Sequence, residues 1–286
     1  MAPPFTTDSA AAGAADFLKR HPTIVAGAAL LLLIALAAIF APLIARDPLA
    51  FEPINRLRGP SDTFWLGTDS LGRDVYARMV YGARISLLVG LSVAAISVLS
   101  GAVVGLLAGY FERVDAVVMR LMDGIMAIPA ILLAIALVAL LGASVKVVII
   151  AIAIPEIPRV TRLVRAVVLS VRDLPFVEAA RSNGTRVAKL LRRHILPSTV
   201  APLIVQATYI CASAILTEAG LSFLGAGTPP EFPTWGNMIA SSRLYLQIAP
   251  WTIFAPGICL ALVVLAVNLL GDGLRDRLDP RIARRM

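Results

Sequence analysis

Residues 85–110 read ISLLVGLSVAAISVLSGAVVGLLAGY and contain no charged side chain. A helix of about 20 apolar residues crosses the ~30 Å hydrocarbon core of a bilayer. This stretch of 26 residues is therefore long enough to span one. Its apolar residues run on without the alternation of polar and apolar positions that is typical of a barrel strand. The stretch predicts a transmembrane helix and points to an all-α membrane protein.

The composition supports the same class. The 286-residue chain is 58% hydrophobic and 15% charged, whereas soluble domains are about 45–50% apolar and about 25% charged. This argues against a water-soluble enzyme and against a disordered chain. The net charge of +8 is interpreted as topological, not as a sign of nucleic-acid binding, because Lys and Arg collect in cytoplasmic loops. Cys211 and Cys259 lie inside apolar runs and fit packing positions.

Five further apolar runs bring the predicted number of transmembrane helices to six. The run at 147–157 is the weakest, because three arginines follow it, and it is expected to continue as an amphipathic helix. Lys19 and Arg20 precede the first run, which leaves a cleaved signal peptide as an alternative, although the run exceeds the usual ~7–15 apolar residues of a signal. The predicted spans are 23–45, 85–110, 117–141, 147–157, 198–224 and 250–270.

An even number of spans places both termini on one side of the membrane. With the N-terminus inside, the inner segments hold 18 of the 26 Lys and Arg residues and the outer segments hold 8, which favours an N-in, C-in topology. The expected organisation is a cytoplasmic tail over 1–22, a transmembrane helix over 23–45, an outer (periplasmic) loop with an amphipathic helix over 46–84, a five-helix core over 85–271 that includes a cytoplasmic hairpin at 172–197, and a cytoplasmic tail over 272–286.

The segment 172–197 reads RDLPFVEAARSNGTRVAKLLRRHILP. Asp173 is expected to cap a short helix whose first turn holds Pro175. Gly184 can end that helix in the left-handed conformation. Thr185 is expected to cap a second helix, and Pro197 opens the fifth span. The pattern predicts a helix–turn–helix, and a positively charged loop that only fixes topology is the alternative.

The second predicted helix of this hairpin is amphipathic. Val187, Leu190, Leu191 and His194 share one face by their i, i+3, i+4, i+7 spacing, while the basic residues lie largely on the other faces. The apolar face can rest on the helix bundle or on a partner. Ala179 and Ala180, in the first helix, allow another surface to approach closely.

The spacing in this segment resembles the signature of the permease subunits of ABC-type importers. Glu178-Ala-Ala is followed after three intervening residues by Gly184, and after nine more intervening residues by His194-Ile-Leu-Pro. The general signature has Ile where this chain has His194, and His-Ile-Leu-Pro is common in the peptide branch of the family. The resemblance implies that the hairpin couples the permease to an ATPase, with Glu178, Ala179, Ala180, Gly184, Leu196 and Pro197 as the candidate coupling residues.

Two more segments resemble the dipeptide and oligopeptide permeases of that family, in the second of their two permease subunit types. They are residues 66–90, where Ala77 stands in place of an expected Ser, and residues 218–238. The resemblance covers about 24–280. It implies the type I ABC importer permease fold in the bacterial inner membrane. The implied partners are a homologous second permease subunit, two cytoplasmic ATP-binding subunits, an extracytoplasmic solute-binding protein and membrane lipid, with no nucleic acid.

The resemblance implies import of di- or oligopeptides, with nickel complexes, glutathione or another small solute as alternatives. The chain is not expected to be an enzyme or to hold a cofactor or metal. A phosphate-binding loop needs Gly-x-x-x-x-Gly-Lys-Ser/Thr, and Lys19, Lys146 and Lys189 all lack that setting. No catalytic set of Ser, His and Asp is apparent.

Three carboxylates lie within the apolar runs, where charge is expensive and functional roles are the default hypothesis. Asp123, Glu156 and Glu218 are all placed near an interface, so local pairing is the favoured explanation, for instance between Asp123 and Arg120. A stand-alone secondary transporter is the competing class. It would need internal repeats and ion ligands at mid-membrane.

A polar segment before the second span carries the remaining candidates. The residues from Thr68 to Asp74 can cap a helix and form a surface ion pair. Alternatively, they contact the binding protein or form part of an outer gate. The outer candidates are Asp69, Gly72, Arg73 and Asp74.

Overall fold

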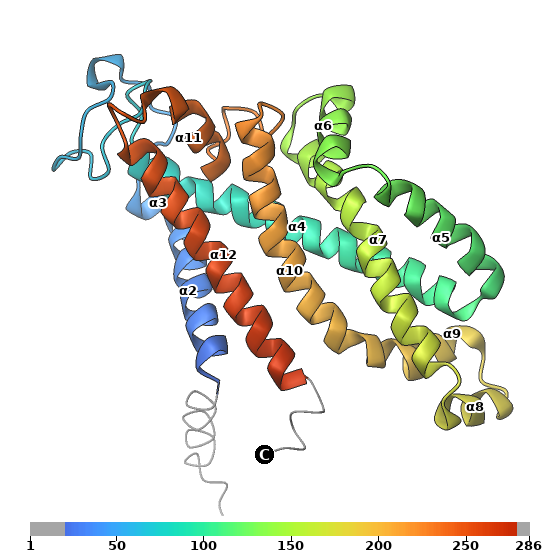
Figure 1. The fold of residues 1–286 in the computed structure, drawn as a ribbon. Helices are drawn as coiled ribbons and strands as arrows, with labels where there is room; N and C mark the ends of the chain where they lie inside the picture. The colour runs from blue at the N-terminus through green and yellow to red at the C-terminus, as the bar shows by residue number, and fades with distance from the viewer. Residues whose placement is uncertain (1–20, 279–286) are drawn as a thin grey trace, which may run out of the picture.

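The computed structural model describes residues 21–278, and within them the chain is helical apart from its loops and one isolated β-bridge between Thr68 and Asp74 (Figure 1). The α-helices are α2 (Pro22–Ile39), α3 (Ala41–Ile44), α4 (Val75–Tyr110), α5 (Glu112–Met126), α6 (Ala130–Leu141), α7 (Val145–Val171), α8 (Pro175–Ser182), α9 (Val187–Leu190), α10 (Leu196–Phe223), α11 (Trp235–Ser242) and α12 (Trp251–Leu278).

Four helical stretches of the described residues are long and apolar enough to cross a membrane. They are α2, α4, the stretch from Val187 to Phe223 that ends with α10, and α12. A fifth candidate is the pair α5–α6, taken as one broken span. The all-helical membrane class is therefore confirmed. Six spans were predicted, whereas the described residues contain four or five candidates. Helix α7 is not among them, because charged side chains are distributed along it.

The segment predicted as the third span, 117–141, is not one straight helix. The chain forms α5 and α6 instead, and the two helix axes differ in direction by 85°. Pro129 stands at the break with ψ of 127°, outside the helical region. Proline lacks an N–H and pushes the residue before it out of the α conformation, which explains why the helix ends here.

The longest helix, α4, packs closely along α7. Three glycines of α4 at intervals of four residues face valines of α7 at the same intervals. A Cβ built on each glycine would lie 2.5–2.8 Å from the Cβ of the opposing valine. Only glycine permits an approach this close. The three contacts are Gly101 with Val160, Gly105 with Val164 and Gly109 with Val168.

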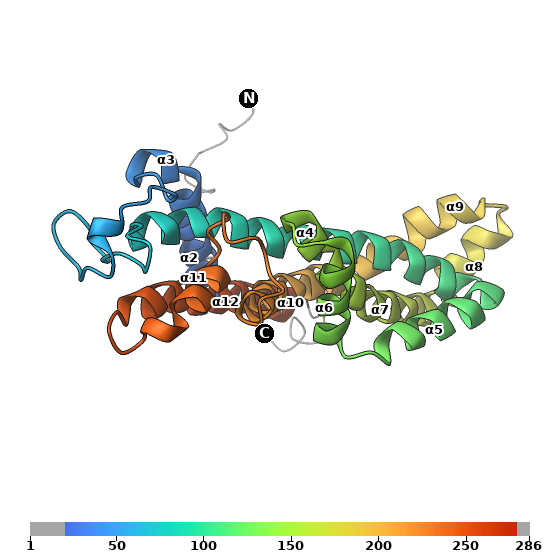
Figure 2. The ribbon, with the colours of Figure 1, turned by 90° about the horizontal axis from the view of Figure 1, so that it is seen from above.

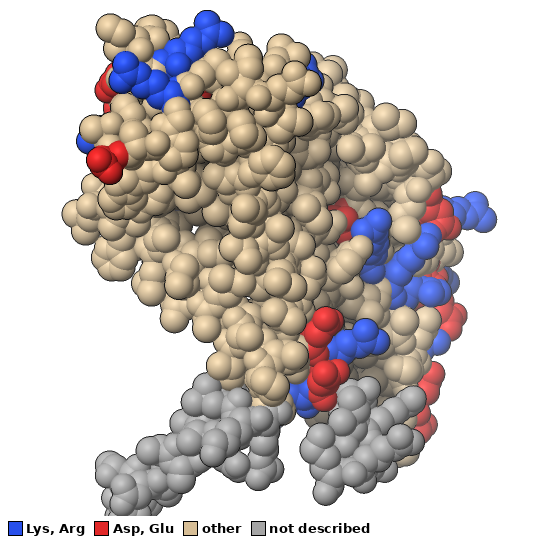
Figure 3. All heavy atoms as spheres, turned by 60° about the vertical axis from the view of Figure 1, so that its left-hand side comes forward, with Lys and Arg blue, Asp and Glu red and all other residues tan. Residues whose placement is uncertain are grey.

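The first and last helices, α2 and α12, also pack through glycine. A Cβ on Gly27 would lie 2.7 Å from the carbonyl oxygen of Ala266, and one on Gly273 would lie 2.3 Å from Cγ1 of Ile24. Large apolar side chains such as Leu33 and Leu43 remain exposed on the outside. On the face seen in Figure 3, charged side chains gather toward the ends and a broad uncharged band lies between them. This distribution is what a bilayer selects.

Candidate functional site

The α8–α9 hairpin lies at one end of the molecule, far from the loop that precedes α4 (Figure 2). Its first helix begins at Pro175 as expected. Leu174 occupies the N-cap position without a side-chain hydrogen bond, so the expected cap by Asp173 is wrong. Because the helix begins one residue later than that prediction requires, Asp173 precedes the cap position. Its carboxylate lies 3.5 Å from Nε of Arg172 instead.

The turn of the hairpin is fixed by Gly184, as the sequence predicts. Gly184 has φ of +73°, in the left-handed region that favours glycine. Its N–H donates to the carbonyl of Arg181 at 2.9 Å, and the N–H of Thr185 donates to the carbonyl of Ala180 at 3.2 Å. These two bonds form a Schellman motif, which satisfies the last carbonyls of α8.

The second half of the hairpin differs from the expectation. Arg186 occupies the N-cap of α9, so Thr185 lies one residue too early to cap it. Helix α9 then passes through a π-helical turn over Leu191–Ile195 into α10, with Leu190 and Ile195 buried. Val187, expected on the apolar face, is 39% exposed.

The hairpin presents a mixed surface to its surroundings. Val177 faces inward, while Glu178 and Ala179 are exposed and Ala180 is half-buried. Phe176 is 49% exposed, which leaves an aromatic ring beside the small residues. Of the candidate coupling residues, Glu178, Ala179, Ala180 and Gly184 lie together on the first arm and turn. Leu196 and Pro197 lie on the other arm, where α10 begins.

Three arginines of α7 and its C-cap bond residues of α4 and α5. Nη1 of Arg172 donates to the carbonyl of Gly109 at 3.1 Å, and Nη2 lies 3.9 Å from Oε1 of Glu112. Arg165 pairs with Asp115, with an Nη2–Oδ2 distance of 2.6 Å. These contacts link the base of the hairpin to α4 and α5. Sequence reasoning missed them, although acidic residues in α5 and basic residues in α7 were a visible signal.

The third arginine, Arg162, corrects one expectation. Asp123 bonds Arg162 of α7 and not Arg120 of its own helix. Arg162 comes within reach because α5 and α7 lie side by side, a proximity that spacing along α5 does not reveal. Glu156 pairs with Arg159, three residues along the same helix, with an Nη1–Oε1 distance of 3.0 Å. Each of the two carboxylates thus has an arginine partner, Glu156 within its own helix and Asp123 on a neighbouring one.

Glu218 is 1% exposed and is held by hydroxyl groups. Its Oε1 accepts hydrogen bonds from Ser222 at 2.8 Å, Thr234 at 2.9 Å and Thr228 at 3.3 Å. Ser222 belongs to α10, whereas Thr228 and Thr234 belong to the loop between α10 and α11. The carboxyl group therefore joins this loop to the end of α10.

The outer candidates form a compact turn before α4. Asp69 Oδ1 accepts from the backbone N–H groups of Leu71 at 2.8 Å and Arg73 at 3.0 Å, and Oδ2 accepts from Nε of Arg73 at 2.7 Å. Gly72 has φ of +76°, and a Cβ there would lie 1.8 Å from the carbonyl oxygen of Glu52. The structure thus brings three of the outer candidates together, with Asp69 bonded to Arg73 around Gly72.

Asp74, the fourth outer candidate, caps α4. Its Oδ1 accepts from the backbone N–H of Tyr76 at 2.8 Å. Burial raises the pKa of this carboxyl above its ordinary value, and the hydrogen bonds from Ala77 and Tyr76 act in the opposite direction. The cap was anticipated. It begins α4 itself, so residues 75–84 form the first turns of a continuous 36-residue helix, where a separate amphipathic helix was expected.

Comparisons with known proteins agree with one another. Residues 101–284 match the family described as binding-protein-dependent transport system inner membrane component, and residues 13–60 match the N-terminal TM domain of oligopeptide transport permease C. The chain is 60% identical to a probable peptide ABC transporter permease protein, y4tQ, of Sinorhizobium fredii, over 93% of this chain and 92% of the relative.

A second relative and a solved structure extend the comparison. The chain is 46% identical to the dipeptide transport system permease protein DppC of Alkalihalophilus pseudofirmus, over 93% of this chain and 88% of the relative. A solved chain of the MetNI methionine ABC transporter, in an inward-facing conformation, aligns with a TM-score of 0.55 and 18% identity. That alignment covers 70% of this chain and 96% of the other, and it supports a shared fold.

Proposed function

Because the chain belongs to the family of binding-protein-dependent transport system inner membrane components, we propose that its α8–α9 hairpin is the contact through which ATP hydrolysis by a partner drives transport. The protein is the permease subunit of a binding-protein-dependent peptide ABC importer and a multi-pass protein of the inner membrane. It is a non-catalytic membrane component, and its system implies ATPase and binding-protein partners.

The observation that carries the proposal is the Schellman turn at Gly184. It fixes the angle between the two arms of the hairpin and leaves Glu178 and Ala179 exposed. A surface that transmits movement must be rigid in both states of the transporter, so that closure of the ATPases biases the helix bundle between two arrangements. A short helix with small residues and a fixed turn meets that requirement.

The contacts at the base of the hairpin support the same role. Arg172 ties the start of the hairpin to the last turn of α4, and the interlocked glycines of α4 hold it against α7. A displacement of the hairpin therefore moves α4, α5 and α7 together. The second arm continues through the π-helical turn into α10, which gives the hairpin a connection to a further span.

The membrane arrangement and assembly complete the proposal. Six spans arise if the broken pair α5–α6 counts as one and α7 as another. An N-in, C-in topology then places the hairpin in the cytoplasm, and the excess of Lys and Arg on that side supports it. The full transporter pairs this chain with a homologous second permease subunit, and two ATP-binding subunits contact the two hairpins.

The test is ATPase activity of the complete complex, co-expressed with its neighbouring subunits and reconstituted in liposomes, with binding protein loaded with a dipeptide. Gly184→Pro removes the N–H that bonds Arg181 and forbids the left-handed φ, so the variant is expected to lose stimulation or assembly. Gly142→Pro is the matched control. Gly142 also has positive φ, at +84°, and donates to Val138 at 3.0 Å, but it lies in the loop between α6 and α7.

If the Gly184 variant and wild type show equal stimulation of ATPase activity, the hairpin does not couple the subunits, and its positive charge serves only to set the membrane topology. Loss of activity in both proline variants would show a general folding defect. In that case, a bulky side chain introduced at exposed Ala179 tests the docking of the hairpin on the ATPase without changing the turn. The ligand that loads the binding protein identifies the substrate. Stimulation by glutathione or nickel, and not by peptides, would replace the peptide assignment.

A further inference from the structure

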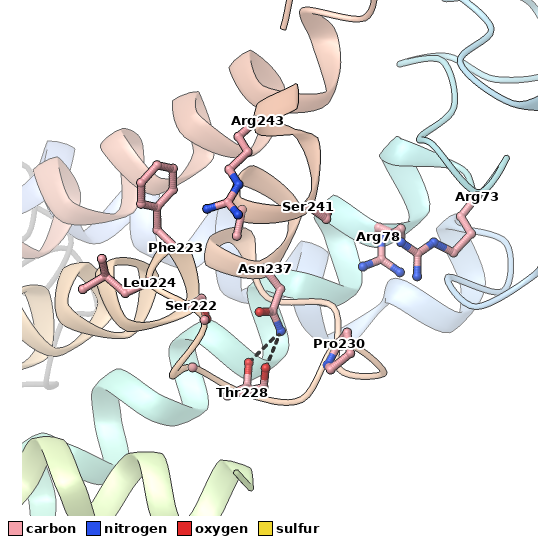
Figure 4. Close-up of a pocket in the computed structure, with 13 residues that line it drawn as sticks. Arg73, Arg78, Ser222, Phe223, Leu224, Thr228, Pro230, Asn237, Ser241 and Arg243 are labelled. Carbon is pink, nitrogen blue, oxygen red and sulfur yellow. Dashed lines mark hydrogen bonds between the residues drawn. The ribbon is translucent and has the colours of Figure 1, made fainter. Parts of the chain in front are cut away.

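The outer ends of α4, α10 and α11 border a hollow of about 320 Å³ whose walls carry three guanidinium groups. Figure 4 shows Arg73 and Arg78 on one side and Arg243 with Phe223 on the other, with Asn237 and Ser241 between them. None of the described residues that line this hollow is acidic. We refer to it as the arginine hollow.

The charges around the arginine hollow do not balance. Oδ2 of Asp69 lies 2.7 Å from Nε of Arg73 and 3.7 Å from Nε of Arg78, so one carboxylate serves two guanidinium groups. Glu218 lies behind the wall, bonded to the hydroxyls of Ser222 and Thr228. Even with both carboxylates ionised, three positive charges face two negative ones.

Arg78 and Arg243 have donors to spare. Arg78 is 2% exposed, and in the described part of the chain its side chain donates one hydrogen bond, to the carbonyl of Pro48 at 3.5 Å. A guanidinium group carries five N–H donors, and buried donors without acceptors are costly. Arg243 lies over the ring of Phe223 at 5.9 Å and forms no ion pair with any described residue.

The wall opposite these arginines is held in place. Nδ2 of Asn237 contacts the carbonyl oxygens of Thr228 at 2.9 Å, Pro229 at 3.2 Å and Phe232 at 3.2 Å. Together with the hydroxyl bonds to Glu218, these contacts fix the loop between α10 and α11. A ligand entering the hollow therefore meets a preformed wall, which lowers the ordering cost of binding.

We propose that the arginine hollow binds the C-terminal carboxylate of a peptide substrate on the outer side of the permease. This inference rests on the proposed function, because it assumes that peptides arrive at that side. A carboxylate is the natural partner of guanidinium groups, since charge-assisted hydrogen bonds to it are short and strong. Phe223 and Leu224, both exposed beside the hollow, supply an apolar surface for the peptide's last side chain.

The experiment measures binding of alanyl-phenylalanine and of its C-terminal amide to the purified permease–ATPase complex without binding protein. Wild type is expected to bind the free acid at least fivefold more tightly than the amide. Arg243→Gln should abolish this preference, and Arg243→Lys should keep part of it. Arg58→Gln is the matched control, because Arg58 is an exposed arginine of the outer loop that does not line the hollow.

Equal affinity of wild type for acid and amide, no binding of the acid, or an unchanged preference in Arg243→Gln would each overturn the inference. A fourth result would overturn it as well: Arg243→Gln loses binding-protein-stimulated ATPase activity but still prefers the free acid over the amide. The hollow would then bind an acidic side chain of the binding protein and not the peptide. ATP-dependent uptake of the dipeptide by the wild-type complex is measured separately. Its absence would refute the peptide assignment itself, whichever way the binding result falls.

Discussion

The guanidinium group of Arg172 donates a hydrogen bond to the carbonyl oxygen of Gly109 at 3.1 Å. This bond joins the residue that follows α7 to the last turn of α4, 63 residues earlier in the chain. The acceptor is one of the carbonyls that a helix leaves without an internal partner at its C-terminus. A positive charge is favourable at that end of a helix as well, so the contact is stabilised twice.

Replacing Arg172 by Gln should weaken coupling while the transporter still assembles. The shorter neutral side chain cannot reach both Gly109 and Glu112, so the hairpin loses its tie to α4. We expect binding-protein-stimulated ATPase activity to fall at least fivefold, with basal activity retained. Lys146→Gln, at the opposite end of α7, is the charge-matched control and should behave as wild type. A stimulated rate equal to wild type in the Arg172 variant would show that the tie is not needed.

Replacing Gly105 by Leu should destabilise the helix bundle. Even a Cβ there would lie 2.7 Å from the carbonyl oxygen of Thr161 and 2.8 Å from Cβ of Val164. Overpacking of this kind costs about 1–3 kcal/mol, and a larger side chain adds strain. Gly124→Leu in α5 is the control, since a Cβ on Gly124 meets nothing within 4 Å. Thermal unfolding in detergent should show a clear drop in Tm for the first variant only; equal values would contradict the close packing of α4 on α7.

Replacing Glu218 by Leu should loosen the loop between α10 and α11. The change removes the acceptor of three buried hydroxyls, and each unsatisfied group costs about 1–3 kcal/mol. Glu218→Gln keeps a carbonyl acceptor and should retain most of the stability. Limited proteolysis within 225–234 reports on the loop directly. The prediction fails if the two variants are cleaved at the same rate.

Replacing Gly72 by Ala should disrupt the outer turn. The new Cβ would collide with the carbonyl of Glu52, and the residue would be held at a φ that alanine rarely adopts. Gly59→Ala is the control, because its Cβ would meet its nearest atom, in Trp251, at 3.9 Å. Hydrogen exchange of the backbone amides in 66–74 should accelerate only in the Gly72 variant. Unchanged exchange there would mean that the turn tolerates the side chain.

The sequence predicted the features that depend on short-range chemistry. Pro175 at the start of α8, Gly184 in its turn and Pro197 in the first turn of α10 were all anticipated, because each follows from a local backbone preference. The caps by Asp173 and Thr185 were predicted wrongly. In both cases the N-cap is the residue after the predicted one. The sequence alone does not determine the first residue of a helix to within one position.

Features that depend on partners distant in the chain were not predictable from the sequence. Arg162 lies 39 residues from Asp123, and only the packing of α5 on α7 brings the two together. Arg78 stands in a stretch that was identified for its resemblance, but its place in a hollow with Arg243 requires α4 and α11 to meet. The break at Pro129 did have a local signal, whereas the 85° angle between α5 and α6 follows from no local backbone preference.

The uninterrupted course of α4 makes it a lever arm. Its 36 residues span about 54 Å at 1.5 Å per residue, with the cap at Asp74 at one end and the tie to Arg172 near the other. A rigid rod of that length pivoting at its midpoint moves each end by about 0.5 Å for every degree of tilt. A rotation of only a few degrees imposed at the hairpin therefore shifts the arginines beside the outer turn by more than the tolerance of a hydrogen bond. If the hairpin moves with the ATPases as proposed, opening of the inner side and release of a ligand from the arginine hollow become two ends of one motion.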